Sequence, residues 1–279
     1  MMDVSHPEII DVVRRALDED IGAGDVTSEA CIPAGQLASG DFLARESQVI
    51  AGVELLPLIY KMRGGVERLD LRKNSGDRAG PGEVIASVSG KARTLLICER
   101  VALNFLQRLG GVATLAAKYV ERVAGTGCRV LDTRKTTPGL RRLEKMAAAA
   151  GGVTNHRMGL YDAILIKNNH IAAAGGVRRA IEAARNASDL PIEIEVRTRE
   201  ELMEALNAGA AHVLLDNFTP AEAAELVRVA HGRAMVELSG GVTLDNIGDY
   251  ARTGADYVSS GAITHSAVAV DVSFRLTLE

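Results

Sequence analysis

Cationic side chains follow two apolar runs in the middle of this sequence, at positions where a buried strand would end. Arg134 and Lys135 come after the run in CRVLDTRK, and Lys167 closes the run in DAILIK. A charge at the end of a buried strand gives up part of its water and needs a partner of opposite charge. That partner is either an anionic ligand or a carboxylate elsewhere in the protein. Arginine suits a carboxylate ligand because its planar fork donates two parallel hydrogen bonds.

The segment around these residues is basic, although the whole chain has a net charge of −4. Residues 132–170 include seven cationic and three acidic side chains. Arg141, Arg142 and Lys145 fall on a predicted helix, and we expect them to form a solvated face of it. The cations at the strand ends indicate a ligand with several negative groups.

Two carboxylates occupy similar positions farther along the chain. Glu195 lies near the end of PIEIEV, on the same strand face as Glu193, and Asp216 ends HVLLD. Hard oxygen ligands beside phosphate-binding groups predict a Mg²⁺ site at Glu195 and Asp216. The alternative, which can hold at the same time, is that these carboxylates neutralise Lys167 and Arg134.

Glycines form a third group of candidate site residues. Ser239, Gly240 and Gly241 stand between a predicted strand and a predicted helix, and Gly261 takes the equivalent place one unit later. Exposed backbone N–H groups at helix N-termini bind phosphate, and glycine lets the anion come close. A tight turn explains the Ser-Gly-Gly sequence equally well.

The elements that must position these residues are short apolar runs that alternate with Ala-rich helical stretches from residue 128 onward. Six such alternations predict an α/β fold with a parallel sheet. The runs end in polar residues, which are Asp132, Lys167, Glu195, Asp216, Ser239 and Ser260. Because several strands of an α/β barrel contribute to a site at its C-terminal rim, this pattern favours a barrel. An open, doubly wound sheet is the alternative.

The first part of the chain has a different pattern. Residues 1–108 mix helical and strand-like stretches, and a long helical stretch begins at Ala92 and is interrupted by Gly110 and Gly111. The last residues alternate like an edge strand. We therefore predict an N-terminal α/β domain, 1–108, completed by a C-terminal strand, 271–279, and a barrel domain, 109–270.

Composition excludes several classes of protein. The negative net charge and the lack of Trp argue against a nucleic-acid binder. Cys31, Cys98 and Cys128 are too few and too far apart for a disulfide framework or a zinc cluster. The sequence has no signal-peptide pattern and no apolar run of about 18 residues, so we expect a cytoplasmic protein without membrane contact. It has no Gly-x-Ser-x-Gly motif, so a covalent nucleophile is not indicated.

The motifs are similar to those of the quinolinate phosphoribosyltransferases. The stretches that carry the resemblance are LDTRKTTPGLRRLEKMA, GGVTNHRMGLYDAILIKNNHI, IEIEV, LLDNF, ELSGGV and SSGAITHS. It extends from EDIGAGDVTSE to DVSFRL, and departs from the family pattern at Asn168 and Met146. The resemblance implies an incomplete, seven-stranded α/β barrel with an N-terminal α/β sandwich domain. Residues 153–156 are the candidate for the seventh strand. It also implies at least a homodimer in which each N-terminal domain closes the partner's barrel.

The resemblance further implies a reaction. Phosphoribosyl pyrophosphate and quinolinate give nicotinate mononucleotide, pyrophosphate and CO₂, a step of NAD synthesis that uses Mg²⁺. The residues expected to hold the quinolinate carboxylates are Arg134, His156, Arg157 and, from the partner subunit, Arg100. Those expected in catalysis are Lys135, Lys167, Glu195 and Asp216, of which the last two hold ribose hydroxyls and Mg²⁺, and Lys167 also contacts substrate. Those expected at the 5′-phosphate are Ser239, Gly240, Gly241, Gly261 and His265.

Three alternatives stay open on the sequence. A nicotinate phosphoribosyltransferase has the same fold, but its acceptor has one carboxylate and does not need this many cations. A molybdenum-associated relative usually lacks the NHR and IKxNH patterns. A non-catalytic anion-binding barrel would keep the glycine loops but not Glu195 together with Asp216.

Overall fold

The computed structural model describes residues 3–278, which form two compact units. The first unit runs to Ala117 and adds residues 136–152 and the segment from Ser266 onward. The second contains residues 118–135 and 153–265. The described residues include no helix long and apolar enough to cross a membrane.

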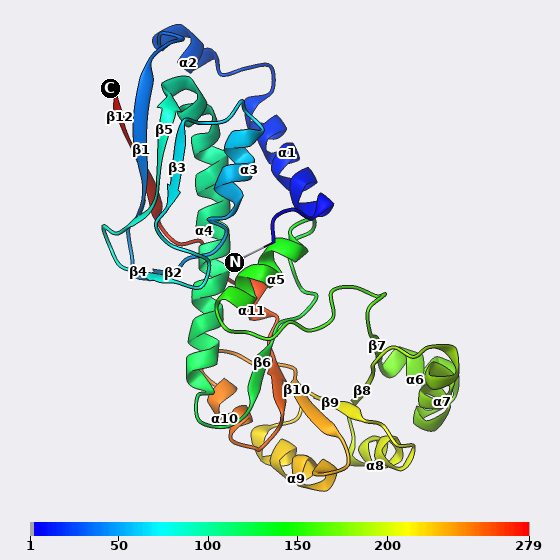
Figure 1. The fold of residues 1–279 in the computed structure, drawn as a ribbon. Coiled ribbons are helices and arrows are strands. Elements are labelled where there is room, and N and C mark those ends of the chain that lie inside the picture. The colour runs from blue at the N-terminus through cyan, green and yellow to red at the C-terminus, as the bar shows by residue number, and fades with distance from the viewer. Residues whose placement is uncertain (1–2, 279) are drawn as a thin grey trace. The chain divides into compact units, whose positions relative to one another are not determined.

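A four-stranded sheet forms the framework of the first unit, in the order β12-β1-β5-β3 (Figure 1). The strands are β12 (Val272–Leu278), β1 (Leu37–Ala44), β5 (Val84–Lys91) and β3 (Arg68–Leu71), and every neighbouring pair is antiparallel. Phe42 of β1 lies opposite Phe274 of β12, with ring centroids 4.7 Å apart. The C-terminal strand is thus fixed to a sheet made of residues from the first third of the chain. A small separate sheet pairs β2 (Gln48–Val49) with β4 (Arg78–Ala79).

Five helices accompany these sheets. They are α1 (Pro7–Ile21), α2 (Val26–Cys31), α3 (Leu55–Lys61), α4 (Ala92–Arg122) and α5 (Arg141–Ala150). α1 buries Ile9, Val13 and Leu17, which recur at helical spacing. Asp25 begins α2, because its side chain accepts the backbone N–H of Ser28 at 2.9 Å.

α4 is continuous, so the predicted interruption at Gly110 and Gly111 is wrong. A Cβ atom on Gly111 would lie 2.1 Å from the carbonyl oxygen of Val268, and one on Gly110 would lie 2.8 Å from a methyl group of Val270. The glycines therefore leave room for the chain that leads into β12. Helix propensity alone could not reveal this, because a close backbone approach and a helix break both favour glycine.

The predicted solvated face of α5 is also wrong for Lys145. Lys145 and Glu144 are both fully buried in the first unit. Glu144 accepts hydrogen bonds from Arg108 and from the hydroxyl of Thr137, each at 2.7 Å. Arg142 forms an ion pair with Glu8 at 2.8 Å. This part of the basic segment holds the first unit together.

Six parallel strands form the sheet of the second unit, as predicted. Their order is β6-β11-β10-β9-β8-β7. In chain order they are β6 (Arg129–Leu131), β7 (Ile164–Ile166), β8 (Ile192–Val196), β9 (His212–Asp216), β10 (Met235–Ser239) and β11 (Tyr257–Ser259). Residues 153–156 form no strand, but Thr154 makes an isolated parallel bridge to Leu131 of β6.

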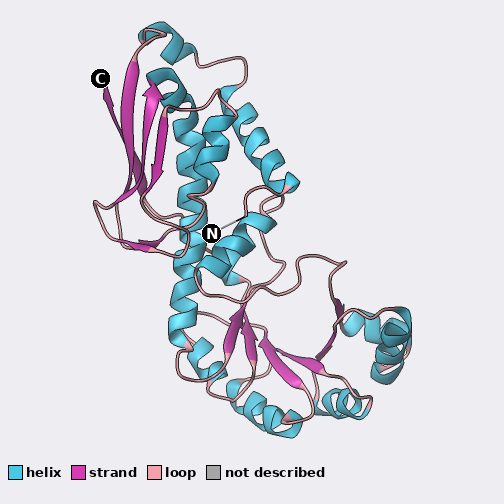
Figure 2. Cartoon of the chain, viewed as in Figure 1, coloured by secondary structure: helices cyan, strands magenta, loops and turns pink. Residues whose placement is uncertain are grey.

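Helices follow the strands from β7 onward, and most of them lie on the outer side of the sheet (Figure 2). They are α6 (Asn168–Ala174), α7 (Val177–Ala187), α8 (Arg199–Asn207), α9 (Pro220–Ala230), α10 (Ile247–Ala251) and α11 (Ala262–His265). The central strands bury apolar side chains on the helix-covered side, such as Ile194, Val213 and Val236. Since all the strands are parallel, their C-terminal ends meet at one edge. Asp216 at the end of β9 pairs in register with Ser239 at the end of β10.

Candidate functional site

A cavity of about 450 Å³ opens at the C-terminal ends of the parallel strands. Ten of the predicted site residues line it: Arg134, Lys135, His156, Arg157, Lys167, Glu195, Asp216, Ser239, Gly240 and Gly241. Gly261 lies beside it, because a Cβ on Gly261 would be 2.7 Å from Cδ of Lys135 and 3.1 Å from Cδ2 of His265. Arg100 is exposed on α4 in the first unit.

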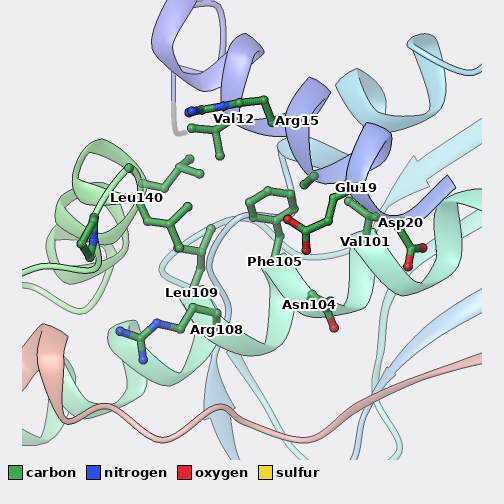
Figure 3. Close-up of a pocket in the computed structure, with 14 residues that line it drawn as sticks. Val12, Arg15, Glu19, Asp20, Val101, Asn104, Phe105, Arg108, Leu109 and Leu140 are labelled. Carbon is green, nitrogen blue, oxygen red and sulfur yellow. The ribbon is translucent and has the colours of Figure 1, made fainter. Parts of the chain in front are cut away.

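The first unit has a cavity of its own, of about 480 Å³ (Figure 3). Val12 and Arg15 of α1 lie on one side of it, and Phe105 and Leu109 of α4 on the other. The guanidinium of Arg108 in its wall is already bound to Glu144. In the described part of the chain its lining includes no predicted site residue, so the candidate site is the cavity of the second unit.

Two aspartates shape the loop that carries His156 and Arg157. The carboxylate of Asp132, which is fully buried, accepts the backbone N–H of His156 at 2.8 Å and the side-chain amide of Asn155 at 2.6 Å. Asp162 accepts the backbone N–H groups of Met158 and Gly159 at 2.6 and 2.9 Å. These bonds fix the loop between α5 and β7, whose His156 and Arg157 side chains line the cavity.

Arg157 and Arg134 are close enough to affect each other. Partial burial and the positive charge of Arg134 lower the pKa of Arg157, against the opposing effect of Asp162 and Glu193. Two guanidinium groups that repel each other in a partly dry cavity are stabilised by an anion between them.

Both ring nitrogens of His156 are occupied by protein groups. The backbone N–H of Arg157 donates to Nδ1 at 2.7 Å, so Nδ1 presents a lone pair. The proton of the neutral ring is then on Nε2, which lies 2.9 Å from a carboxylate oxygen of Glu193 and 3.5 Å from one of Glu237. A direct contact of His156 with a substrate carboxylate therefore requires Nε2 to leave Glu193.

Glu193 and Glu237 form a buried pair beneath His156. Burial and the neighbouring carboxylate of Glu193 raise the pKa of Glu237 well above its usual range. Burial acts in the same direction on Glu193, but the hydrogen bond from His156 and the nearby His212 outweigh it and lower its pKa. The pair therefore favours one charged and one protonated carboxyl group.

The predicted metal ligands are both bound to cationic side chains. Lys167 Nζ lies 2.9 Å from Oε2 of Glu195. Nη2 of Arg197 lies 3.0 Å from Oε1 of Glu195 and 3.1 Å from Oδ2 of Asp216. One guanidinium nitrogen thus bridges the two carboxylates.

The Ser-Gly-Gly loop approaches β9 closely. Gly240 and Gly241 have φ angles of 93° and 61°, in the left-handed region that favours glycine. A Cβ on Gly240 would lie 2.3 Å from Oδ1 of Asn217. The helix predicted to follow directly begins only at Ile247. Gly240 and Gly241 therefore lie in a loop and not at a helix N-terminus.

The sequence did not reveal the roles of Arg197 and Glu237. Glu237 of β10 and Glu193 of β8 face each other from the two strands that flank β9. In both strands, side chains alternate between the two faces of the sheet, and both glutamates lie on the face opposite the helices. That repetition was a usable signal, since EIEV and VEL both carry acidic residues within apolar runs. Arg197 follows its strand without any periodic pattern, so only the structure shows its partners.

Comparison with known proteins covers nearly the whole chain. The family model for the N-terminal domain of quinolinate phosphoribosyl transferase matches residues 25–110, and the model for the C-terminal domain matches residues 112–275. The chain is 39% identical to a probable carboxylating nicotinate-nucleotide pyrophosphorylase of Bacillus subtilis, over 99% of this chain and 96% of that protein. It is 42% identical to the carboxylating nicotinate-nucleotide pyrophosphorylase of Mycobacterium leprae, over 95% and 96% of the two chains. The crystal structure of NadC from Streptococcus pyogenes superposes with a TM-score of 0.95 at 37% identity, over all of both chains.

Proposed function

The chain belongs to the quinolinate phosphoribosyl transferase family, and from this membership we infer that it transfers phosphoribosyl from phosphoribosyl pyrophosphate to quinolinate. The products are nicotinate mononucleotide, pyrophosphate and CO₂, in the synthesis of NAD. The observation that carries this function is the cavity lined by Arg134, Arg157, Lys135 and Lys167 beside two carboxylates. Such a cavity suits a dicarboxylic acid beside a phosphorylated sugar.

We propose that Arg134 and Arg157 bind the two carboxylates of quinolinate. Their mutual repulsion in the free cavity supports this role, because a dianion relieves it. Arg100 of a partner subunit completes the set. His156 joins these residues when its Nε2–H donates to the substrate in place of Glu193. Otherwise it positions Arg157 through the hydrogen bond that Nδ1 accepts.

For the second substrate, Ser239, Gly240, Gly241, Gly261 and His265 bind the 5′-phosphate, and Lys135 lies between them and the quinolinate site. Glu195 and Asp216 hold ribose hydroxyls and Mg²⁺. The shared contact of these two carboxylates with one Arg197 nitrogen supports the fit of a cation there. When bound, Mg²⁺ supplies positive charge that stabilises pyrophosphate as it leaves.

The chain's own residues act by position and charge. Arg134 and Arg157 direct the pyridine nitrogen of quinolinate toward the anomeric carbon. Lys167, held at Glu195, places its ammonium beside the ribose. After transfer the pyridine ring is cationic, and this charge stabilises the carbanion that remains when CO₂ departs. A proton then completes the product.

The finer architecture follows from the same membership. We propose that the six parallel strands and the bridge at Thr154 are the seven members of an incomplete barrel, and that the first unit is the N-terminal α/β sandwich domain. The assembly is a homodimer or larger, with sites shared between subunits. Free Cys31, Cys98 and Cys128 fit a location in the cytoplasm, where thiols stay reduced.

The decisive experiment incubates the protein with quinolinate, phosphoribosyl pyrophosphate and Mg²⁺, and follows release of CO₂ and formation of the mononucleotide. Nicotinate replaces quinolinate in a parallel reaction. We expect turnover with quinolinate only. Turnover with nicotinate alone would assign the non-carboxylating reaction, and binding of quinolinate without product would assign a non-catalytic role. Omitting Mg²⁺, and replacing Glu195 by Gln with Asp216 by Asn, should each remove most of the activity.

A further inference from the structure

Arg197 occupies the place between the two carboxylates at which the proposed function puts a divalent cation. Its Nη2 atom lies within 3.1 Å of an oxygen of both Glu195 and Asp216. Glu195 is almost fully buried, so its negative charge needs a positive partner whether or not a metal is bound. In the free protein the guanidinium provides much of that charge.

The same nitrogen and a metal ion cannot occupy this place together. Mg²⁺ binds carboxylate oxygens at about 2.0–2.1 Å, so an ion shared by Glu195 and Asp216 would overlap Nη2. Two adjacent cations in a partly dry cavity would also repel each other. Entry of the ion therefore requires the guanidinium to leave.

The geometry of Arg197 permits this exchange. Its side chain is 47% exposed, whereas that of Glu195 is 4% exposed. Its backbone N–H donates to Glu201 at 2.7 Å, and Thr198 next to it begins α8 by accepting the N–H of Glu201 at 3.1 Å. The backbone is thus fixed while the long side chain can turn into solvent. Lys167 stays at the other oxygen of Glu195.

We propose that Arg197 is an internal cation that keeps the Glu195–Asp216 pair in place in the free protein, competes with the divalent ion for it, and so sets the affinity of the site for metal. The inference rests on the proposed function, because that function assigns the two carboxylates to the metal. Its effect is moderate, since half-exposed ion pairs are weak.

The test measures binding of Mn²⁺ alone to the full chain, from the loss of the free-ion electron paramagnetic resonance signal. Arg197→Gln should bind Mn²⁺ about threefold to tenfold more tightly than the unchanged protein. Arg197→Lys, which keeps a cation of similar reach, should stay within about twofold of it. Arg199→Gln is the matched control, because it removes the same charge two residues away on the exposed start of α8.

A second readout is the Mg²⁺ concentration that gives half-maximal activity, which should fall in Arg197→Gln in the same proportion. The inference is overturned if Arg197→Gln binds Mn²⁺ no more tightly than Arg199→Gln, or less tightly, or if neither protein binds it measurably. The double variant Glu195→Gln with Asp216→Asn separates the two hypotheses. If it binds Mn²⁺ as well as the unchanged protein, the proposed metal ligands are wrong. If it loses Mn²⁺ while Arg197→Gln is unchanged, only the role of Arg197 is wrong.

Discussion

At the scale of single residues, Glu193 and Glu237 have opposite pKa shifts although they lie against the same histidine. The difference comes from their partners. Both side chains are buried and each has one oxygen without a hydrogen-bond partner, but Nε2 of His156 lies 2.9 Å from Glu193 and 3.5 Å from Glu237. Only Glu193 therefore receives the hydrogen bond from His156. A protonated Glu237 avoids a second negative charge in a dry environment. The Glu193–Glu237 pair therefore favours a single negative charge beneath His156.

This arrangement predicts how stability depends on pH. The pKa of Glu237 is raised in the folded protein above the usual 4.5. Protonated Glu237 therefore contributes fully to the free energy of unfolding below pH 4.5, and this contribution is lost as the pH rises through the folded-state pKa. Glu237→Gln resembles the protonated form and does not ionise. We expect its melting temperature to fall less than that of the unchanged protein between about pH 5 and pH 9. Melting curves by circular dichroism over that range provide the measurement.

Glu237→Ala is the contrasting variant. It removes the hydrogen-bonding group and leaves a cavity, so we expect a loss of about 2–4 kcal/mol in the free energy of unfolding near neutral pH. Equal pH dependence in Glu237→Gln and the unchanged protein would show that Glu237 ionises normally.

Arg134 gives a prediction about binding. If it forms a two-pronged contact with a quinolinate carboxylate, Arg134→Gln should weaken quinolinate binding by a factor of about 10–150, because glutamine can keep one of the two hydrogen bonds and the loss of the other, to a charged group, costs about 1.5–3 kcal/mol. Titration calorimetry with quinolinate measures the change. Arg252→Gln is the control, since Arg252 is exposed and paired only with Asp249 in the contacts of the described chain. Unchanged quinolinate affinity in Arg134→Gln would contradict the assignment.

The charged residues at the strand ends were the part of the site that the sequence predicted best. Arg134, Lys167, Glu195 and Asp216 each follow or end an apolar run, and parallel strands bring such ends together. The partners of these residues were less accessible. Lys145 was predicted to be solvated because its helix carries three cations, yet it is buried beside Glu144. A charge pattern along one helix does not show which face packs against another element.

At the scale of elements, α4 offers a test of whether a Gly→Ala substitution inside a helix raises or lowers the stability of the protein. Gly→Ala inside a helix usually stabilises by about 0.8–1 kcal/mol. Gly111→Ala should destabilise instead, because its Cβ would lie 2.1 Å from the carbonyl oxygen of Val268. We expect a loss of about 1–3 kcal/mol, measured by urea unfolding.

The control for this prediction is Gly35→Ala. A Cβ on Gly35 meets nothing within 4 Å, and its φ angle is outside the left-handed region. This variant should be neutral or slightly more stable. A stabilised Gly111→Ala protein would mean that the segment before β12 does not pack against α4 as described.

Six strands and most helices could be predicted because apolar periodicity changes clearly between them. The prediction missed α6, which begins directly after Lys167 at the end of β7. Its sequence, NNHIAAA, begins with three polar residues that resemble a loop. The side chain of His170 accepts the backbone N–H of Lys167 at 2.9 Å, and this bond starts the helix. Local capping by histidine is a weak signal in a sequence, so the boundary was found only in the structure.

At the scale of the whole molecule, the cations divide into two groups with different functions. Those of α5 join parts of the first unit, as Arg142 does with Glu8. Those at the strand ends of the second unit line a cavity together with carboxylates, and Lys167 pairs there with Glu195. Both groups come from one basic segment of the sequence. The fold separates them because residues 136–152 pack with the first unit, while the residues on either side belong to the second.

A complementation experiment tests whether sites are shared between subunits. Arg100 and Arg157 belong to different units of the chain, and we propose that they meet only across a subunit interface. Arg100→Ala and Arg157→Ala should each be nearly inactive as homodimers. A purified heterodimer of the two, isolated with different affinity tags, contains one site with both changes and one with neither. It should therefore recover about half of the unchanged activity per dimer.

The same mixture made from Arg134→Ala and Arg157→Ala, which alter residues that line one cavity, serves as the control. It should stay inactive, because each site then carries one of the two changes. Failure of the first mixture to recover activity, in dimers whose composition is verified, would show that Arg100 is not supplied by a partner.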